Sequence, residues 1–206
     1  MKNSVKIAVL CGIAVLLVGF QVVRFATRET PTRHTDMEEA QVGQRLAELI
    51  DARTADGGVV TVVVLFRQGV MPYQTRIDTL VADLSATATV QVIWARDEKL
   101  YNDDNYTATI DAALDRQPGT QTLVVIGGGS VTHADVSPRL QAFLDAQGEL
   151  VLNGGTSRDS AFVQLAQAGH ATILARRTTW LQSDAETEAE TTGYVDRHYV
   201  LLPGEG

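Results

Sequence analysis

Apolar residues follow two different spacings in the part of the chain after residue 35. Short runs rich in β-branched residues, such as Val59 to Phe66, alternate with longer stretches in which apolar residues recur at helical spacing. A continuous apolar run is typical of a strand buried on both faces, and a period of about 3.6 residues is typical of a helix with one buried side. Strands are expected over residues 59–66, 89–95, 122–126, 149–153, 170–175 and 197–202.

The expected helices lie between these runs, and several of their ends carry local signals. Thr35-Asp36-Met37-Glu38 matches a capping box, Pro72 and Ser137-Pro138 suit the first turn of a helix, and Gly148 suits a helix end. Short strands that alternate with helices predict βαβ units with right-handed crossovers. We therefore expect a doubly wound α/β domain with a mostly parallel sheet of about six strands in the order 2-1-3-4-5-6 and helices on both faces.

The helix expected over residues 36–53 has no strand before it, so it is not a crossover between strands. Its apolar residues form a narrow stripe: Val42, Leu46, Leu49 and Ile50. A helix with so narrow a stripe needs a partner surface to be stable in water. We expect it to pack on the sheet or to associate with another chain.

The N-terminal segment predicts a membrane anchor. Residues 7–23 are uncharged and approach the ~20 residues that cross a bilayer, and Lys2 and Lys6 form a basic flank. Cleavage after Ala26 would need a small residue where Arg24 stands, so the anchor is expected to stay attached. This gives a transmembrane helix preceding the domain and three segments: a signal anchor over residues 1–26, a linker over 27–35 and the Rossmann-like, flavodoxin-like α/β domain over 36–206.

The anchor predicts a single-pass membrane protein. Its N-terminal tail is very short, which favours export of the C-terminal domain to the periplasm or another extracytoplasmic compartment. Cys11 follows Leu10, whereas a lipoprotein signal needs a small residue before the cysteine, so lipidation is not expected. Cys11 is the only cysteine, which excludes disulfide frameworks, zinc fingers and cysteine nucleophiles from the exported part.

Charge narrows the choice of partners. Of 17 basic and 25 acidic residues, five bases and one acid lie in the first 33 positions, which leaves 12 bases, 24 acids and a net charge of −12 in the rest. Lys99 is the only lysine beyond that segment. A domain of this charge repels phosphate backbones, so neither nucleic acid nor ATP is an expected partner.

A ligand site is expected where the strand order reverses. In doubly wound sheets the ligand crevice lies beyond the carboxyl ends of the strands, here between the loops after the first and third strands. Bare backbone amides in a glycine run can approach a ligand closely, and the following helix N-terminus favours an anionic or polar group. The candidate ligand-binding residues are Arg67, Gln68, Tyr73, Gly127, Gly128, Gly129, Ser130 and Asn153.

The glycine run at residues 127–129 has a simpler explanation as well, because a loop that leaves a crowded sheet uses glycine to turn. It is not a dinucleotide fingerprint, since the last glycine of GxGxxG would fall at Thr132 and the motif should follow the first strand. Ser130 is not a nucleophile elbow, because GxSxG also needs glycine at Thr132. No cofactor, metal or catalytic residue is therefore assigned.

Other polar residues at the same edge have two explanations each. The acidic residues after the second strand could bind a hard cation, but helix capping and solvation also account for them: Asp97, Glu98, Asp103 and Asp104. A second group would make the rim locally basic and aromatic, which suits an anionic or polyhydroxylated ligand, although neighbouring acids could pair with its arginines: Arg96, Arg158, Arg176, Arg177, Trp94 and Trp180.

From Val59 onward, the order strand, helix, strand, helix, strand resembles the N-terminal lobe of type 1 periplasmic sugar-binding proteins. The stretch that carries this resemblance runs from residues 105–115 through Gln117-Pro118 into the strand at 122–126. Residues 140–155 are also similar to class I glutamine-amidotransferase-like domains. The resemblances imply the fold and the ligand edge, but not catalysis: the second sugar-binding lobe is missing, and the amidotransferase cysteine has no counterpart outside the anchor.

Together these features predict a membrane-anchored, exported binding or interaction module without catalytic activity. It would bind a small polar or anionic ligand, or serve as an accessory subunit of a membrane complex. The alternative is a hydrolase or amidotransferase-like enzyme that uses Ser130 or Ser157 with His133, so the sequence leaves the question of an enzyme open.

Overall fold

The computed structural model describes residues 32–70, 73–101, 106–127, 136–154, 160–176, 195 and 198–202. The chain divides into two units, Met1–Thr35 and Asp36–Gly206, and the second contains the whole sheet. None of the helices described is long and apolar enough to cross a membrane. The segment predicted as the anchor, residues 7–23, lies outside the described residues.

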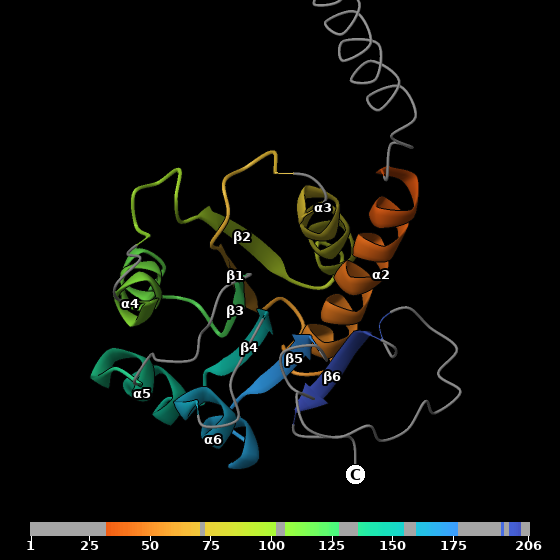
Figure 1. Cartoon of the computed structure of the whole chain (residues 1–206). Coiled ribbons are helices and arrows are strands. Elements are labelled where there is room, and N and C mark those ends of the chain that lie inside the picture. Colours follow the sequence, from red (N-terminus) through yellow and green to blue (C-terminus); the bar gives the residue numbers. More distant parts are fainter. Residues whose placement is uncertain are drawn as a thin grey trace, which may run out of the picture. The chain divides into compact units, whose positions relative to one another are not determined.

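A six-stranded sheet organises the domain (Figure 1). Its strands are β1 (Val59–Val64), β2 (Thr89–Trp94), β3 (Thr122–Ile126), β4 (Glu149–Gly154), β5 (Thr172–Arg176) and β6 (Tyr199–Leu202). They lie in the order β2-β1-β3-β4-β5-β6, and all neighbours are parallel except β5 and β6, which are antiparallel. The predicted strand order and the mostly parallel sheet are confirmed.

Helices cover both faces of this sheet, as predicted (Figure 1). The five described are α2 (Thr32–Asp51), α3 (Tyr73–Leu84), α4 (Tyr106–Arg116), α5 (Pro138–Asp145) and α6 (Ala161–Gln167). Buried residues of α2 and α3 share one apolar cluster with the sheet, and those of α4, α5 and α6 share another. The sheet therefore separates two hydrophobic cores.

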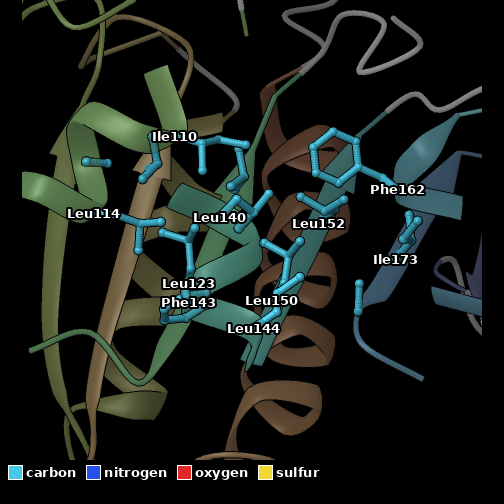
Figure 2. Packing of buried hydrophobic residues seen from close by; sticks show 14 of the residues in the cluster. Ile110, Leu114, Leu123, Leu140, Phe143, Leu144, Leu150, Leu152, Phe162 and Ile173 are labelled. Atoms are coloured by element: carbon cyan, nitrogen blue, oxygen red, sulfur yellow. The ribbon is translucent and has the colours of Figure 1, made fainter. Parts of the chain in front are cut away.

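Alternating strand residues supply the two cores, as the pleat of a strand requires. In β1, Val62 and Val64 belong to the α2–α3 core, whereas Val63 belongs to the α4–α6 core. Figure 2 shows the second core, where Leu140 and Phe143 of α5 lie among leucines of β3 and β4. Because both faces are covered, the central strands have the continuous apolar sequences from which they were predicted.

The helix starts differ from the sequence signals at Thr35 and agree with them at Ser137. The capping box at Thr35 is wrong, because α2 already begins at Thr32. In the sequence Pro31 stands directly before Thr32, and proline is tolerated at the start of a helix but not in its interior. Helix α6 begins after Ser160, whose hydroxyl accepts a hydrogen bond from the Phe162 N–H. The cap at Ser137 is confirmed, since its Oγ accepts from the Leu140 N–H at 2.9 Å.

Helix α2 packs on the domain, which is one of the two alternatives open from the sequence. Val42, Leu46 and Ile50 of its narrow stripe are fully buried in the core that α2 shares with α3 and β1. The close approach to α3 depends on Gly43, where an added Cβ would lie 2.5 Å from the carbonyl oxygen of Arg76.

Replacing Gly43 with alanine should destabilise the domain by about 1–3 kcal/mol, because the new methyl group overpacks the contact between α2 and α3. Alanine is otherwise the better helix former by about 1 kcal/mol, so a net loss reports the contact itself. Equilibrium urea unfolding of the full-length chain in detergent measures the change. The control is Gly119→Ala, where an added Cβ meets nothing within 4 Å. Equal stability of the two variants would contradict the close packing of α2 on α3.

Candidate functional site

Bonds to the loop after β2 fix the loop that follows β1. The Gln68 N–H donates to Asp97 Oδ2 at 2.7 Å, and Arg96 Nε donates to the Leu65 carbonyl oxygen at 3.0 Å. Two residues of the candidate site lie in this loop, and both Arg67 and Gln68 are exposed. The two loops therefore form one polar rim next to the point where the strand order reverses.

Tyr73, a third candidate residue, belongs to an aromatic stack at the start of α3. Its ring lies 4.2 Å from that of Phe66, with 8° between the two planes. The guanidinium carbon of Arg76 lies 5.2 Å from the Tyr73 ring centroid, a cation–π distance. The position of Tyr73 is thus tied to Phe66 in the loop after β1 and to an arginine one turn further along α3.

Arg76 is the centre of a buried polar network that the sequence analysis missed. Its Nε donates to Glu39 Oε2 at 2.7 Å, its Nη1 to Asn153 Oδ1 at 2.5 Å and its Nη2 to the Tyr199 hydroxyl at 3.1 Å. A second contact of 2.5 Å joins Nη2 to Glu39 Oε2. Arg76, Glu39 and Tyr199 are each only 3 % exposed, and Asn153 is 2 % exposed. Four segments, α2, α3, β4 and β6, therefore meet at one guanidinium group.

Asn153, another candidate residue, belongs to this network. Its Oδ1 accepts from Arg76, and its Nδ2 donates to the carbonyl oxygen of Leu174 at 3.1 Å. Its backbone carbonyl accepts from the Gly127 N–H at 3.0 Å, which joins the ends of β4 and β3. The side chain is occupied in the core, so direct contact between Asn153 and a ligand stays a prediction.

The described glycines at this edge are required by packing. A Cβ at Gly127 would lie 2.6 Å from Leu65 Cδ1, and a Cβ at Gly154 would overlap the carbonyl oxygen of Gly127. Leu65 after β1, Gly127 after β3 and Gly154 at the end of β4 consequently lie too close together for larger residues at the two glycines. This agrees with the simpler explanation of the glycine run at Gly127. The remaining candidates, Gly128, Gly129 and Ser130, lie outside the described residues, as do Ser157 and His133.

A second aromatic pair lies on the opposite face of the sheet. Tyr106, the first residue of α4, meets Phe162 of α6 edge to face, with ring centroids 6.4 Å apart. The Tyr106 hydroxyl is buried and has no hydrogen-bond partner in the part of the chain that the structure describes. Burial, and to a smaller extent the charge of Tyr101, raises the pKa of Tyr106 far above its ordinary value. The phenol is therefore neutral at all ordinary pH values.

The acidic residues after β2 that the structure describes have structural partners. Asp97 accepts from Gln68, while Glu98 accepts from the Trp94 N–H at 3.2 Å and pairs with Arg116. Within the described segments no three histidine, cysteine, aspartate or glutamate side chains gather as a metal site would need. Five further residues lie outside those segments: Asp103, Asp104, Arg158, Arg177 and Trp180.

Two hollows in the described surface lie away from the predicted ligand edge. One of about 200 Å³ is bounded by the segments before β3 and β4, with Phe143 in its wall. Another of about 470 Å³ lies between the second halves of α2 and α3, beside Glu48 and Asp83. Neither is lined by residues of the loops after β1 and β3.

Comparison with known proteins finds a likeness of fold. No protein family matches the chain, and no curated protein does. A sugar ABC transport substrate-binding protein from Bordetella parapertussis 12822 is similar in structure, with a TM-score of 0.48 and 14 % identity over 67 % of this chain and 41 % of that one. The arabinose-binding protein AraP from Geobacillus stearothermophilus matches with a TM-score of 0.41 and 14 % identity, over 70 % and 46 % of the two chains.

A putative LacI transcriptional regulator from Bacteroides fragilis is also similar, with a TM-score of 0.45 and 10 % identity, over 68 % of this chain and 47 % of that one. The chain thus spans less than half the length of each of these structures. The resemblance to type 1 sugar-binding proteins expected from the sequence is found, and it concerns the fold.

Two buried tyrosines allow a matched test of the network. Tyr199→Phe should lower the free energy of unfolding by about 1–2 kcal/mol, because the Arg76 guanidinium loses a hydrogen-bond acceptor. Tyr106→Phe should leave stability unchanged or raise it, because its hydroxyl is buried without a partner. Urea unfolding of both variants measures the difference. A loss at Tyr106 that equals or exceeds the loss at Tyr199 would contradict the assigned contacts.

Proposed function

We propose that this protein is a membrane-anchored binding or interaction module without catalytic activity, whose domain is exported to the periplasm or another extracytoplasmic compartment. The anchor is the apolar segment over residues 7–23. The domain binds a small polar or anionic ligand at the carboxyl edge of its sheet, between the loops after β1 and β3. Arg67, Gln68, Tyr73, residues 127–130 and Asn153 form this site.

The proposal rests mainly on Arg67, an exposed arginine at the point where the strand order reverses. Arg67 follows β1, and it takes part in none of the ion pairs identified among the described residues. The residues on either side of it are held in place, Phe66 by stacking on Tyr73 and Gln68 by its bond to Asp97. An arginine on a fixed backbone suits recognition of a carboxylate, a phosphate or the hydroxyl groups of a polyol.

The buried network around Arg76 supports the same site by fixing two of its candidate residues. Arg76 contacts Tyr73 and Asn153, which stand at the start of α3 and near the end of β4. These two candidate residues therefore keep fixed positions without a ligand, which reduces the ordering cost of binding. In this proposal Arg76 is a positioning residue, because its own donors are directed at Glu39, Asn153 and Tyr199.

Arg67→Ala should weaken ligand binding at least about tenfold, the loss expected when one charge-assisted contact is removed. Isothermal titration of the full-length chain in detergent with D-arabinose, myo-inositol and inorganic phosphate measures affinity for polyol and anionic probes. Arg53→Ala is the control, because it removes the same charge between α2 and β1, at the opposite edge of the sheet. A probe that binds both variants equally well would place the ligand elsewhere.

An accessory subunit of a membrane complex is the second candidate function, and the anchor predicted at residues 7–23 favours it. Purification of the full-length chain from detergent-solubilised membranes distinguishes the accessory subunit from the ligand-binding module. Fixed partners recovered in stoichiometric amounts would favour the subunit, whereas a lone chain that binds one of the probes would favour the ligand-binding module. Labelling of Ser130 or Ser157 by a fluorophosphonate would instead indicate the hydrolase alternative.

A further inference from the structure

Strand β2 forms one edge of the sheet, and part of this edge is open. Thr89 N–H donates to the Gly58 carbonyl oxygen and Ala95 N–H to that of Val64, both at 2.9 Å. In a parallel ladder, successive residues direct their backbone groups to opposite sides. Residues 89, 91, 93 and 95 therefore face β1, and the backbone groups of Val90, Val92 and Trp94 face outward.

The outward backbone N–H and C=O groups of Trp94 are both hydrogen-bonded to Glu98, in the turn that follows the strand. Its N–H donates to Glu98 Oε1 at 3.2 Å, and its carbonyl oxygen accepts from the Glu98 N–H at 2.9 Å. Val90 and Val92 are left with two N–H and two C=O groups that pair with no other strand among the described residues. The strand, TVQVIW, also lacks the charges and prolines that commonly protect a sheet edge.

Gln91 provides an independent observation at the centre of this open segment. Its Oε1 is buried and has no hydrogen-bond partner among the described residues, although the residue as a whole is only half-buried. A buried amide oxygen without a donor costs about 1–3 kcal/mol, so an edge strand that retains one is incomplete as it stands. Gln91 lies between the two valines whose backbone groups are open.

We propose that β2 pairs antiparallel with β2 of a second copy of this chain, about a two-fold axis at Gln91. The sequence Val90-Gln91-Val92 reads the same in both directions, so each Val90 lies opposite the partner's Val92. These two pairs exchange four backbone hydrogen bonds and use all four open groups. The two Gln91 residues lie opposite each other on one face, and a turn of each amide about its terminal bond lets the amides pair.

A second copy fits this edge better than an unrelated strand does. Any extended peptide could bond to the backbone of Val90 and Val92, but a second copy about this axis also places an amide opposite the amide of Gln91 through its own symmetry. The flanking pair combines a small and a large side chain, since Ala88 lies opposite the partner's Trp94. No charged residue lies in β2 to oppose the pairing. The net charge of −12 beyond residue 33 opposes association, so the dimer should strengthen as salt screens that charge.

A disulfide across the axis tests the pairing. The two opposite Gln91 residues share no backbone hydrogen bonds, and the Cα atoms of such an antiparallel pair are about 4.5 Å apart. A disulfide can bridge that distance. In a Cys11→Ser background, full-length Gln91→Cys in detergent should form roughly tenfold more cross-linked dimer on mild oxidation than Gln164→Cys, an exposed position on α6. Equal cross-linking at the two positions would overturn the proposal.

Val92→Pro provides the second test, because it removes an outward N–H that bonds to no other strand among the described residues, and proline is tolerated at such edge positions. Sedimentation of the full-length chain in detergent at low and high salt measures the dimer. The wild-type chain should dimerise more strongly at high salt, and Val92→Pro should stay monomeric with an unchanged circular dichroism spectrum. A dimer that persists in the folded Val92→Pro variant, or a wild-type chain that is monomeric at both salt concentrations, would contradict pairing through β2.

Discussion

The buried ion pair between Arg76 and Glu39 is the interaction on which the arrangement of this domain depends. Removing two charges from water is costly, and their attraction offsets that cost only when further hydrogen bonds complete the geometry. Asn153 and Tyr199 supply those bonds, so the guanidinium group is surrounded by acceptors from α2, β4 and β6. Helix α2 must lie close to α3 for Glu39 to reach Arg76, and Gly43 allows that approach.

The same network links the scaffold to the proposed ligand edge. Arg76 holds the Tyr73 ring on one side and the Asn153 amide on the other, while the backbone of Asn153 fixes Gly127 at the end of β3. A displacement of Glu39 on α2 would therefore reach this edge through two successive contacts, first with Arg76 and then with Tyr73 or Asn153. The β2 edge lies on the other side of β1 and offers a separate surface for self-association.

The fold was predictable because both faces of the sheet are covered. Continuous apolar runs such as Val59 to Val64 show strand positions directly, and the helices between them impose right-handed crossovers. The buried network around Arg76 was not predictable, because nothing in the sequence distinguishes Glu39 and Arg76 from charged residues on the solvent-exposed side of a helix. Their burial depends on two helices far apart in sequence meeting over β4. The Thr35 cap was wrong because α2 already begins at Thr32. The Asn153 side chain, predicted as a ligand contact from its place at the end of a strand, is hydrogen-bonded to Arg76 and to the Leu174 carbonyl oxygen in the core.

A double-mutant cycle on Glu39 and Arg76 measures how strongly these two buried side chains are coupled. Glu39→Leu and Arg76→Met should each lower the free energy of unfolding by about 3–5 kcal/mol, because each leaves an uncompensated buried charge. The double variant removes both charges and should lose less than either single variant, as measured by urea unfolding of the full-length chain in detergent. Losses that simply add in the double variant would show that the two side chains are not coupled and would contradict the account.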